Sequence, residues 1–346
     1  MPQTLSQLSD LKSLPFDQII DARSPAEYAE DHIPGAVNMP SLSNDERAVV
    51  GTIYVRESRF RARKVGAAMV ARNIAAHLEG PLAERDGGWR PLVYCWRGGQ
   101  RSGAFASYLS QVGWRADTIE GGYKSYRTLV ARNCYETTFA PRVILLDGHT
   151  GTAKTDLLHL LAGRGVQVLD LEGAANHRGS AFGARAGGQP SQKHFEGVLA
   201  EAMEGFDPSR PVVIEAESSK VGARIVAPTI WAAMKVAPRI RIVAPIEARA
   251  DYLTGAYADL WANPAGLAAG LAALEPMHSG ETMTRWRALT GAGNYRAFTE
   301  ELMVQHYDAR YGKARAQDGT EVVTERLDPV ALDALAGEIE ARLSGL

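Results

Sequence analysis

A strand, a glycine-rich turn and a helix follow one another between residues 143 and 161, and this pattern constrains the fold more than any other in the sequence. The apolar run Val143-Ile-Leu-Leu-Asp147 leads into Gly148-His-Thr-Gly-Thr-Ala-Lys-Thr155. Such a loop can turn its N–H groups inward and present them, with a lysine, to a diphosphate at a helix N-terminus. The pattern predicts a phosphate-binding loop that uses Gly148, Thr150, Gly151, Lys154 and Thr155.

The chain after this loop alternates short apolar runs with helical spacing. We expect strands at Gln167–Asp170, Val212–Glu215 and Ile240–Val243, separated by helices. Strands that alternate with helices form parallel sheets covered on both faces. Residues 139–346 are therefore predicted to form a doubly wound α/β domain with a P-loop and a helical C-terminal part, and Pro141 marks the boundary.

Four residues in or near the phosphate loop leave questions open. Ala153 stands where glycine is usual before the lysine, and its methyl group is compatible with phosphate binding if the backbone φ is negative. The Thr155 hydroxyl is placed to bind Mg²⁺, although no metal ligand is certain. Glu215 and Glu217, at the end of the neighbouring strand, could order Mg²⁺ or its water, or could pair with an arginine.

A second strand–loop–helix junction contains a cysteine. The strand Pro91–Cys95 ends on the thiol, and a helix begins near Ser102. Inward N–H groups, the helix dipole and two guanidinium groups all favour the thiolate, which is the reactive form. Cys134 has no such surroundings and is expected to be a buried structural residue. The predicted catalytic residues are Cys95, Arg97 and Arg101, and Gly98, Gly99 and Ser102 are expected to close around a bound anion.

Length and composition set the frame for these two sites. A chain of 346 residues suits two domains, and residues 1–138 would form the first. Two cysteines make no disulfide framework, and the sequence shows neither a secretory signal nor an apolar run long enough to span a membrane. We therefore expect a cytoplasmic protein without a membrane partner.

The net charge of −2 gives no global attraction to nucleic acid, so any such surface has to be local. Two basic clusters are candidates. Taken alone, each is better explained as a solvated helix face. The first contains Arg56, Arg59, Arg61, Arg63 and Lys64, and the second contains Arg310, Lys313 and Arg315.

Two segments that flank the cysteine carry a resemblance. Asp21-Ala-Arg-Ser-Pro-Ala-Glu-Tyr-Ala-Glu-Asp-His-Ile-Pro-Gly35 and Glu120-Gly-Gly-Tyr-Lys-Ser-Tyr126 resemble the opening and closing signatures of rhodanese domains. Five residues separate Cys95 from Arg101, one more than in simple sulfurtransferases of that family. The longer loop resembles that of rhodanese-fold phosphatases, which suggests a pocket for a phosphate-sized group.

A polar loop after the second strand of the P-loop domain is expected to contact ligand through His177, Arg178 and Ser180. The order of the rhodanese segments, the P-loop, this loop, Gln189-Pro-Ser-Gln-Lys-His-Phe-Glu196 and Glu215-Ala-Glu-Ser218 resembles that of bacterial tRNA 2-selenouridine synthases.

That resemblance implies a tRNA-modifying transferase that replaces sulfur by selenium in wobble 2-thiouridine. The sulfur would first be alkylated with geranyl diphosphate and then exchanged with selenophosphate. No tightly bound cofactor is implied beyond Mg²⁺, and an enzyme that supplies selenophosphate is a candidate partner. With tRNA as substrate, the cluster from Arg56 to Lys64 is reinterpreted as a phosphate contact. Whether Cys95 carries selenium covalently or orients selenophosphate stays open.

Three other interpretations fit parts of the sequence. The first is an ATP-dependent rhodanese-type tRNA sulfurtransferase, in which Cys95 carries persulfide. The second is a non-catalytic regulatory protein whose cysteine loop senses anions. The third is a phosphatase, which the longer loop suggests, although no aspartic general acid can be assigned.

Overall fold

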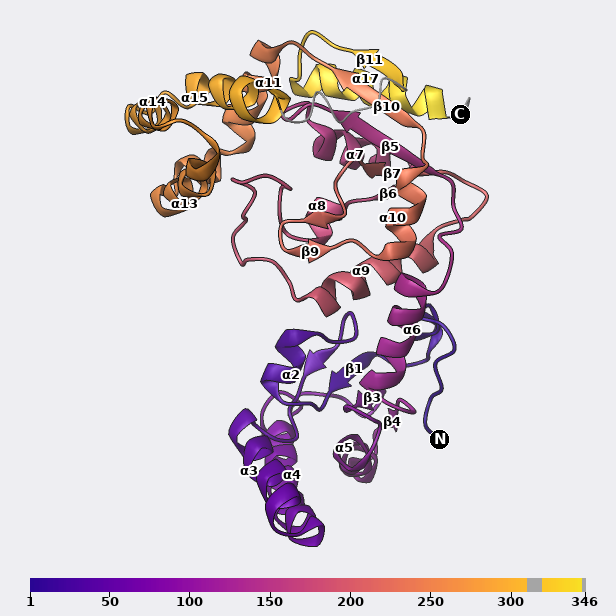
Figure 1. The fold of residues 1–346 in the computed structure, drawn as a ribbon. Coiled ribbons are helices and arrows are strands. Elements are labelled where there is room, and N and C mark those ends of the chain that lie inside the picture. The colour runs from indigo at the N-terminus through magenta and orange to yellow at the C-terminus, as the bar shows by residue number, and fades with distance from the viewer. Residues whose placement is uncertain (310–318, 344–346) are drawn as a thin grey trace. The chain divides into compact units, whose positions relative to one another are not determined.

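The computed structural model describes residues 1–309 and 319–343, and their contacts divide the chain into two units (Figure 1). The first contains Met1–Thr137 together with Pro190–Gly205, and the second contains Thr138–Gln189 and Phe206–Leu346. Each unit has its own parallel sheet with helices packed on it, so the predicted α/β class is confirmed for both. The second basic cluster, Arg310, Lys313 and Arg315, lies outside the described residues.

The sheet of the first unit positions the cysteine. Its strands have the order β2-β1-β3-β4, and all neighbours are parallel. The central strand β3 is buried along its whole length because its apolar residues lie between two neighbouring strands and under helices. The strands are β1 (Gln18–Asp21), β2 (Val37–Asn38), β3 (Pro91–Tyr94) and β4 (Asp117–Thr118), and the flanking helices include α2 (Pro25–Glu30), α5 (Gln100–Val112) and α6 (Tyr123–Tyr135).

Two helices, α3 (Asn44–Arg56) and α4 (Arg59–Glu79), form a hairpin between β2 and β3 (Figure 1). The apolar spacing between Phe60 and His77 predicts a long helix, and helix α4 buries Val70 and Ile74 on its inward face. Helix α3 was not predicted, because none of its residues is buried and apolar periodicity is therefore missing. It is held at its start by a capping box between Ser43 and Glu46.

Helix α9 (Gln192–Gly205) follows the P-loop in the chain but packs on α6 of the first unit. Glu196 pairs with Arg127, and the Cys134 thiol donates to the Glu196 carbonyl at 3.5 Å. Asn133 Nδ2 donates to Glu204 Oε1 at 2.8 Å. The predicted structural role of Cys134 therefore includes anchoring this helix.

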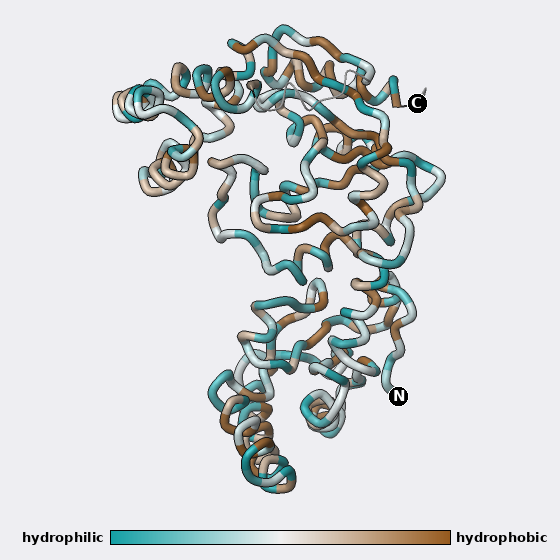
Figure 2. Tube along the Cα trace, in the orientation of Figure 1, coloured by the Kyte–Doolittle hydropathy of each residue, from teal (hydrophilic) through white to brown (hydrophobic). Residues whose placement is uncertain are grey.

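The second unit has a five-stranded parallel sheet in the order β11-β10-β5-β7-β6. The four predicted strands are present, and β5 and β7 are among the most hydrophobic segments of the chain (Figure 2). The fifth, β11, was missed because only Val322 of its Thr-Glu-Val-Val sequence is buried. The strands are β5 (Val143–Gly148), β6 (Gln167–Leu169), β7 (Val212–Glu215), β10 (Arg239–Val243) and β11 (Thr320–Val323).

Helices α7 (Lys154–Gly163) and α17 (Pro329–Leu343) share a core with the sheet face that carries Ile144 and Leu146. Helix α10 (Pro228–Lys235) also contacts β5. None of the helices in the described ranges is both long and apolar enough to cross a bilayer.

The C-terminal helices form an apolar cluster of their own around Trp286 and Phe298. Their last segment, η2, is a π-helix, a form that often occurs at functional positions. The elements are α11 (Ile246–Ala256), α12 (Ala258–Trp261), α13 (Pro264–Leu274), α14 (Gly280–Gly291), α15 (Tyr295–Leu302) and η2 (Met303–Asp308).

Candidate active sites

The Cys95 sulfur lies at the carboxyl end of β3 and at the N-terminus of α5, as the sequence predicted. The Gly99 N–H donates to Sγ at 3.3 Å, and the Ser102 hydroxyl donates to it at 3.2 Å. Burial raises the pKa of the Cys95 thiol, but the Ser102 and Gly99 donors and the Arg101 charge outweigh it and leave the pKa below its ordinary value. The loop thus favours a thiolate.

The two predicted arginines of this loop differ in position. Arg101 Nη1 donates to Glu27 Oε2 at 3.0 Å, so its charge stays near the sulfur in a fixed place. Glu27 also contacts Arg47 and caps α2, and sequence reasoning did not single it out. Arg97 is exposed, and the hydrogen bonds to Sγ come from other residues.

Close packing between the cysteine loop and the closing rhodanese segment explains the glycines of both. Gly98 has φ +63°, and a Cβ there would lie 2.6 Å from the Ile119 carbonyl oxygen. A Cβ on Gly122 would lie 2.1 Å from the Cys95 carbonyl oxygen. Tyr123 N–H donates to that same oxygen at 2.9 Å. Side chains at either glycine would push the loop open.

The phosphate loop joins β5 to α7, and Lys154 Nζ donates to the Gly148 carbonyl at 3.1 Å. Ala153 has φ +56° and ψ +33°, so the negative φ considered from sequence is not what the loop adopts. The turn into α7 requires the left-handed conformation, which costs an L-residue roughly 1–2 kcal/mol. Ala153 is therefore a strained position in an otherwise regular P-loop.

A clamp that the sequence did not reveal holds the phosphate loop to the C-terminal helices. Arg249 of α11 donates to the Thr150 carbonyl at 3.2 Å and pairs with Asp308 of η2 at 2.7 Å. His149 Nδ1 lies 3.1 Å from Asp308 Oδ1. Burial raises the Asp308 pKa, but the contacts with His149 and Arg249 prevail and lower it to about 2. Asp308 is far from the loop in sequence, and no motif marks it.

One cleft collects most of the residues predicted for phosphate binding. Its wall includes Thr150, Gly151, Lys154, Thr155, Arg178, Ser180 and Glu217. Arg178 is fixed by Asp259 at 2.8 Å and lies over the Tyr257 ring at 4.7 Å. Gly148, His177 and Glu215 do not line the cleft. His177 instead accepts the Gly179 N–H through Nδ1 at 3.1 Å and so shapes the polar loop.

Three acidic residues lie beside the lysine of the loop. The Thr155 hydroxyl donates to Glu172 Oε2 at 3.1 Å, and the Glu172 N–H donates to Glu215 Oε1 at 2.7 Å. Burial raises the pKa of Glu215 well above its usual value. Burial and the Glu172 charge raise the pKa of Glu217 to about 7. These residues carry fewer than three negative charges at neutral pH, so an anion can still enter the cleft.

Within residues 1–309 and 319–343, no three His, Cys, Asp or Glu side chains gather as metal ligands would. The Thr155 hydroxyl fits a Mg²⁺ ion that arrives with a diphosphate, since such an ion keeps phosphate and water ligands and needs few from the protein. A metal ion held there would neutralise part of the negative charge of a bound phosphate group.

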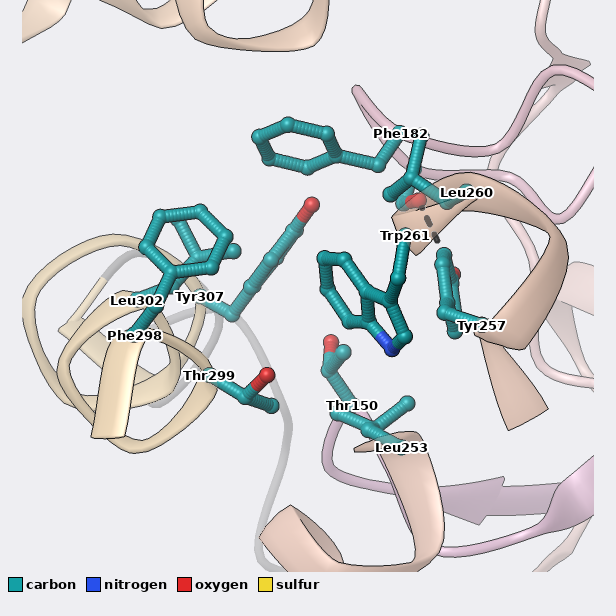
Figure 3. Close-up of a pocket in the computed structure, with 11 residues that line it drawn as sticks. Thr150, Phe182, Leu253, Tyr257, Leu260, Trp261, Phe298, Thr299, Leu302 and Tyr307 are labelled. Carbon is teal, nitrogen blue, oxygen red and sulfur yellow. Dashed lines mark hydrogen bonds between the residues drawn. The ribbon is translucent and has the colours of Figure 1, made fainter. Parts of the chain in front are cut away.

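An apolar pocket with a cavity volume of about 30 Å³ lies beside the cleft. Figure 3 shows Thr150 and Leu253 on one side and Phe182 on the opposite side. Helix α15 contributes Phe298, and α12 contributes Trp261. Sequence reasoning missed this pocket because its aromatic residues come from separate helices and a loop.

The first basic cluster lies at the tip of the α3–α4 hairpin. All five of its side chains are exposed, and only Arg61 has an acidic neighbour within the hairpin tip, Glu57. Exposed Phe60 and Val55 lie among them. Four of the five basic residues occupy the first two turns of α4, whose first turn contains no acidic residue. Positive charge there opposes the helix dipole, so the cluster costs stability.

Two family models match the chain, one over the unit with the cysteine loop and one over the unit with the phosphate loop. A rhodanese-like domain model matches residues 2–129, and the model of the tRNA 2-selenouridine synthase AAA domain matches residues 141–276. The fold and the two loops therefore define a fusion of a rhodanese domain with a P-loop domain.

Curated relatives make the assignment specific. The tRNA 2-selenouridine synthase of Hahella chejuensis is 37% identical over 247 residues, which cover 68% of this chain and 62% of that protein. The Psychromonas ingrahamii protein of that name is 33% identical over 73% of this chain and 68% of its own length. The Aeromonas salmonicida protein of that name is 34% identical over 74% of this chain and 71% of its own length. The chain belongs to the tRNA 2-selenouridine synthase family.

Proposed function

We propose that this chain replaces sulfur by selenium at C2 of a wobble 2-thiouridine in tRNA. The sulfur is first alkylated with geranyl diphosphate, and selenophosphate then supplies selenium. The observation that carries the proposal is the pairing of a thiolate-stabilising loop at Cys95 with a separate diphosphate cleft at Lys154, in a member of this family. One site suits a chalcogen and the other suits a leaving diphosphate.

The first reaction belongs to the P-loop unit. The nucleobase sulfur forms a bond to C1 of the geranyl group, the C1–O bond to diphosphate breaks, and the N3 proton leaves the base. Lys154 and the loop N–H groups stabilise the charge on the departing diphosphate. Alkylation matters because sulfur on C2 is a poor leaving group until it carries carbon.

The second reaction uses the cysteine loop. Selenium of selenophosphate adds to C2, geranylthiolate leaves and takes a proton, and water removes the phosphoryl group as phosphate. The Gly99 N–H, the Ser102 hydroxyl and the Arg101 charge suit a bound selenophosphate, which the Cys95 side chain would orient.

The hairpin tip is the proposed tRNA contact. Arg56, Arg59, Arg63 and Lys64 are exposed and near one another, and Phe60 is 76% exposed beside them. Cations bind phosphates, and an exposed aromatic ring can stack on an unpaired base. A cluster that opposes the helix dipole is better explained by an anionic partner than by stability.

Separate assays of the two reactions test the proposal. With thiouridine tRNA and geranyl diphosphate, Lys154→Ala should lower the yield of geranylated nucleoside by about 100-fold or more, measured by mass spectrometry. The same variant should still convert tRNA that is already geranylated when selenophosphate is added. Cys95→Ser should show the reverse pattern.

Cys134→Ser is the matched control, because it removes the other thiol and should leave both reactions intact. Absence of any geranylated nucleoside with the unmodified chain, together with rapid ATP turnover, would instead establish an ATP-dependent sulfurtransferase. Selenouridine formation that survives Cys95→Ser would support the non-catalytic interpretation of the cysteine loop.

A further inference from the structure

The pocket in Figure 3 has the chemical character of a hydrocarbon site. The rings of Phe182 and Phe298 pack edge to face, with their centroids 5.8 Å apart. The rings of Trp261 and Phe298 pack in the same way, with their centroids 6.3 Å apart. The residues that line the pocket are Thr150, Ser180, Phe182, Leu253, Tyr257, Leu260, Trp261, Phe298, Thr299, Leu302 and Tyr307. A wall of this composition gains free energy by covering an apolar ligand.

Several polar atoms of the wall already have partners within the protein. The Ser180 hydroxyl and the Tyr257 hydroxyl are 3.2 Å apart, and the Thr299 hydroxyl donates to the Tyr295 carbonyl at 2.7 Å. A base or sugar would bring hydrogen-bonding groups that these atoms could satisfy only by giving up their present bonds. The pocket therefore suits a hydrocarbon better than a nucleoside.

The pocket borders the phosphate cleft, and the two share part of their walls. Thr150, Leu253 and Tyr257 belong to the walls of both, and so do Ser180 and Tyr307. Tyr257 marks the transition, because its ring lies under the Arg178 guanidinium on the cleft side and belongs to the aromatic wall on the other. A ligand anchored by phosphate at the loop would place a covalently attached apolar chain in the pocket.

We propose that the apolar side chains of this pocket move apart to bind the hydrocarbon chain of a prenyl diphosphate and that Phe182, which packs against Gly270, closes the far end and limits the chain length. The inference rests on the proposed function, which supplies the prenyl donor. It adds a binding site for the hydrocarbon chain of that donor and a residue that limits the length of the hydrocarbon.

The Phe182 ring packs unusually close to the backbone at Gly270. A Cβ built on Gly270 of α13 would lie 2.2 Å from Phe182 Cδ1 and 2.3 Å from Cε1, so the ring rests directly on the helix backbone. Phe182 is 4% exposed and packs in the same apolar cluster as Phe298. Truncation of the ring should lengthen the pocket, whereas a methyl group at Gly270 should displace the ring and shorten it.

The experiment compares binding of dimethylallyl, geranyl and farnesyl S-thiolodiphosphates, which are poor alkylating agents, with binding of inorganic diphosphate by titration calorimetry. The unmodified chain should prefer geranyl. Phe182→Ala should shift the ratio of farnesyl to geranyl affinity at least tenfold toward farnesyl, and Gly270→Ala should shift the ratio of dimethylallyl to geranyl affinity toward dimethylallyl. Diphosphate affinity should change little in either variant.

Leu274→Ala is the control, because Leu274 is buried in the same cluster but does not line the pocket. It should lower stability without changing chain preference. Unchanged ratios in both pocket variants, in a chain that still binds geranyl more tightly than diphosphate, would overturn this inference alone. If no prenyl analogue binds more tightly than inorganic diphosphate, the proposed prenyl donor is wrong as well.

Discussion

The pKa values of the two cysteines in the same unit are shifted in opposite directions, and the difference comes from their immediate neighbours. Burial raises the pKa of Cys134 to about 11, and the Arg127 charge only partly opposes it. Cys95 is also buried, yet hydrogen-bond donors and a nearby positive charge lower its pKa. Reactivity in this unit therefore follows from the donors around the sulfur and not from exposure.

Ser102→Ala should make the Cys95 thiol harder to ionise, because it removes a hydroxyl that donates to Sγ. A hydrogen bond to a charged acceptor contributes about 1.5 kcal/mol, so alkylation of Cys95 by iodoacetamide at pH 7 should slow roughly tenfold. The rates should converge at alkaline pH.

Ser110→Ala changes an exposed serine of the same helix and should leave the rate unaltered. Equal pH profiles for Ser102→Ala and the unmodified chain would show that Ser102 does not tune the thiol. Cys134 provides an internal reference, since it should resist alkylation at pH 7 in every variant.

Individual site residues were predictable where the backbone alone defines their role. The glycines of both loops and Lys154 follow from a strand, a turn and a helix in sequence order. The conformation of Ala153 could not be deduced, because its residue type favours negative φ and only the closed loop forces the left-handed value. Arg97 is exposed, and the hydrogen bonds to Cys95 Sγ come from Gly99 and Ser102, so the catalytic role of Arg97 stays a prediction.

At the scale of elements, the π-helix η2 connects the C-terminal helices to the phosphate loop through Asp308. This carboxylate contacts Arg249, whose guanidinium is nearly buried and also holds the Thr150 carbonyl. Removing one partner of a buried charge pair leaves the other charge uncompensated. The clamp therefore contributes both to stability and to the shape of the loop.

Asp308→Asn should lower the free energy of unfolding by about 2 kcal/mol at pH 7, measured by urea denaturation. The Asp308 pKa is lowered to about 2 from an ordinary value of 3.8, so its contribution is complete above pH 3.8 and is lost as the pH falls through 2. The difference between variant and unmodified chain should narrow over that interval.

Asp251→Asn is the matched control, because Asp251 is exposed and its ion pair with Arg296 should contribute little. A stability difference for Asp308→Asn that stays constant down to pH 2 would mean that the carboxylate charge is not what holds the clamp.

The elements themselves were predicted well where they bury an apolar stripe and poorly where they do not. The spacing of hydrophobic residues predicts helix α4 and strands β5, β7 and β10. Helix α3 has no buried residue, and β11 has one, so no periodicity was available. The apolar pocket could not be predicted for a related reason, because its wall is assembled from three helices, two loops and η2.

At the scale of the whole molecule, the proposed tRNA substrate is a large anion, whereas this chain has a net charge of −2. A triple variant of the hairpin tip should bind tRNA at least tenfold more weakly near physiological salt. It combines Arg59→Ala, Arg63→Ala and Lys64→Ala. The slope of log affinity against log salt should decrease by about one for each phosphate contact removed. Filter binding over a salt series measures both.

The same triple variant should be as stable as the unmodified chain or up to about 1 kcal/mol more stable, since it removes positive charge from the N-terminal turns of α4. Lys12→Ala, Lys220→Ala and Lys235→Ala combined remove equal charge elsewhere and should leave the salt slope unchanged. A triple variant at the hairpin that binds tRNA normally would exclude this surface.

The position of helix α9 in the sequence determines when the first unit can fold during synthesis. The first unit needs this helix to cover Cys134 and to satisfy Asn133 and the N–H groups of Leu8 and Ser9, yet the helix ends only at Gly205. A ribosome must therefore complete β5, the phosphate loop and β6 before the rhodanese unit can close. The first unit therefore cannot close until part of the second unit has been synthesised.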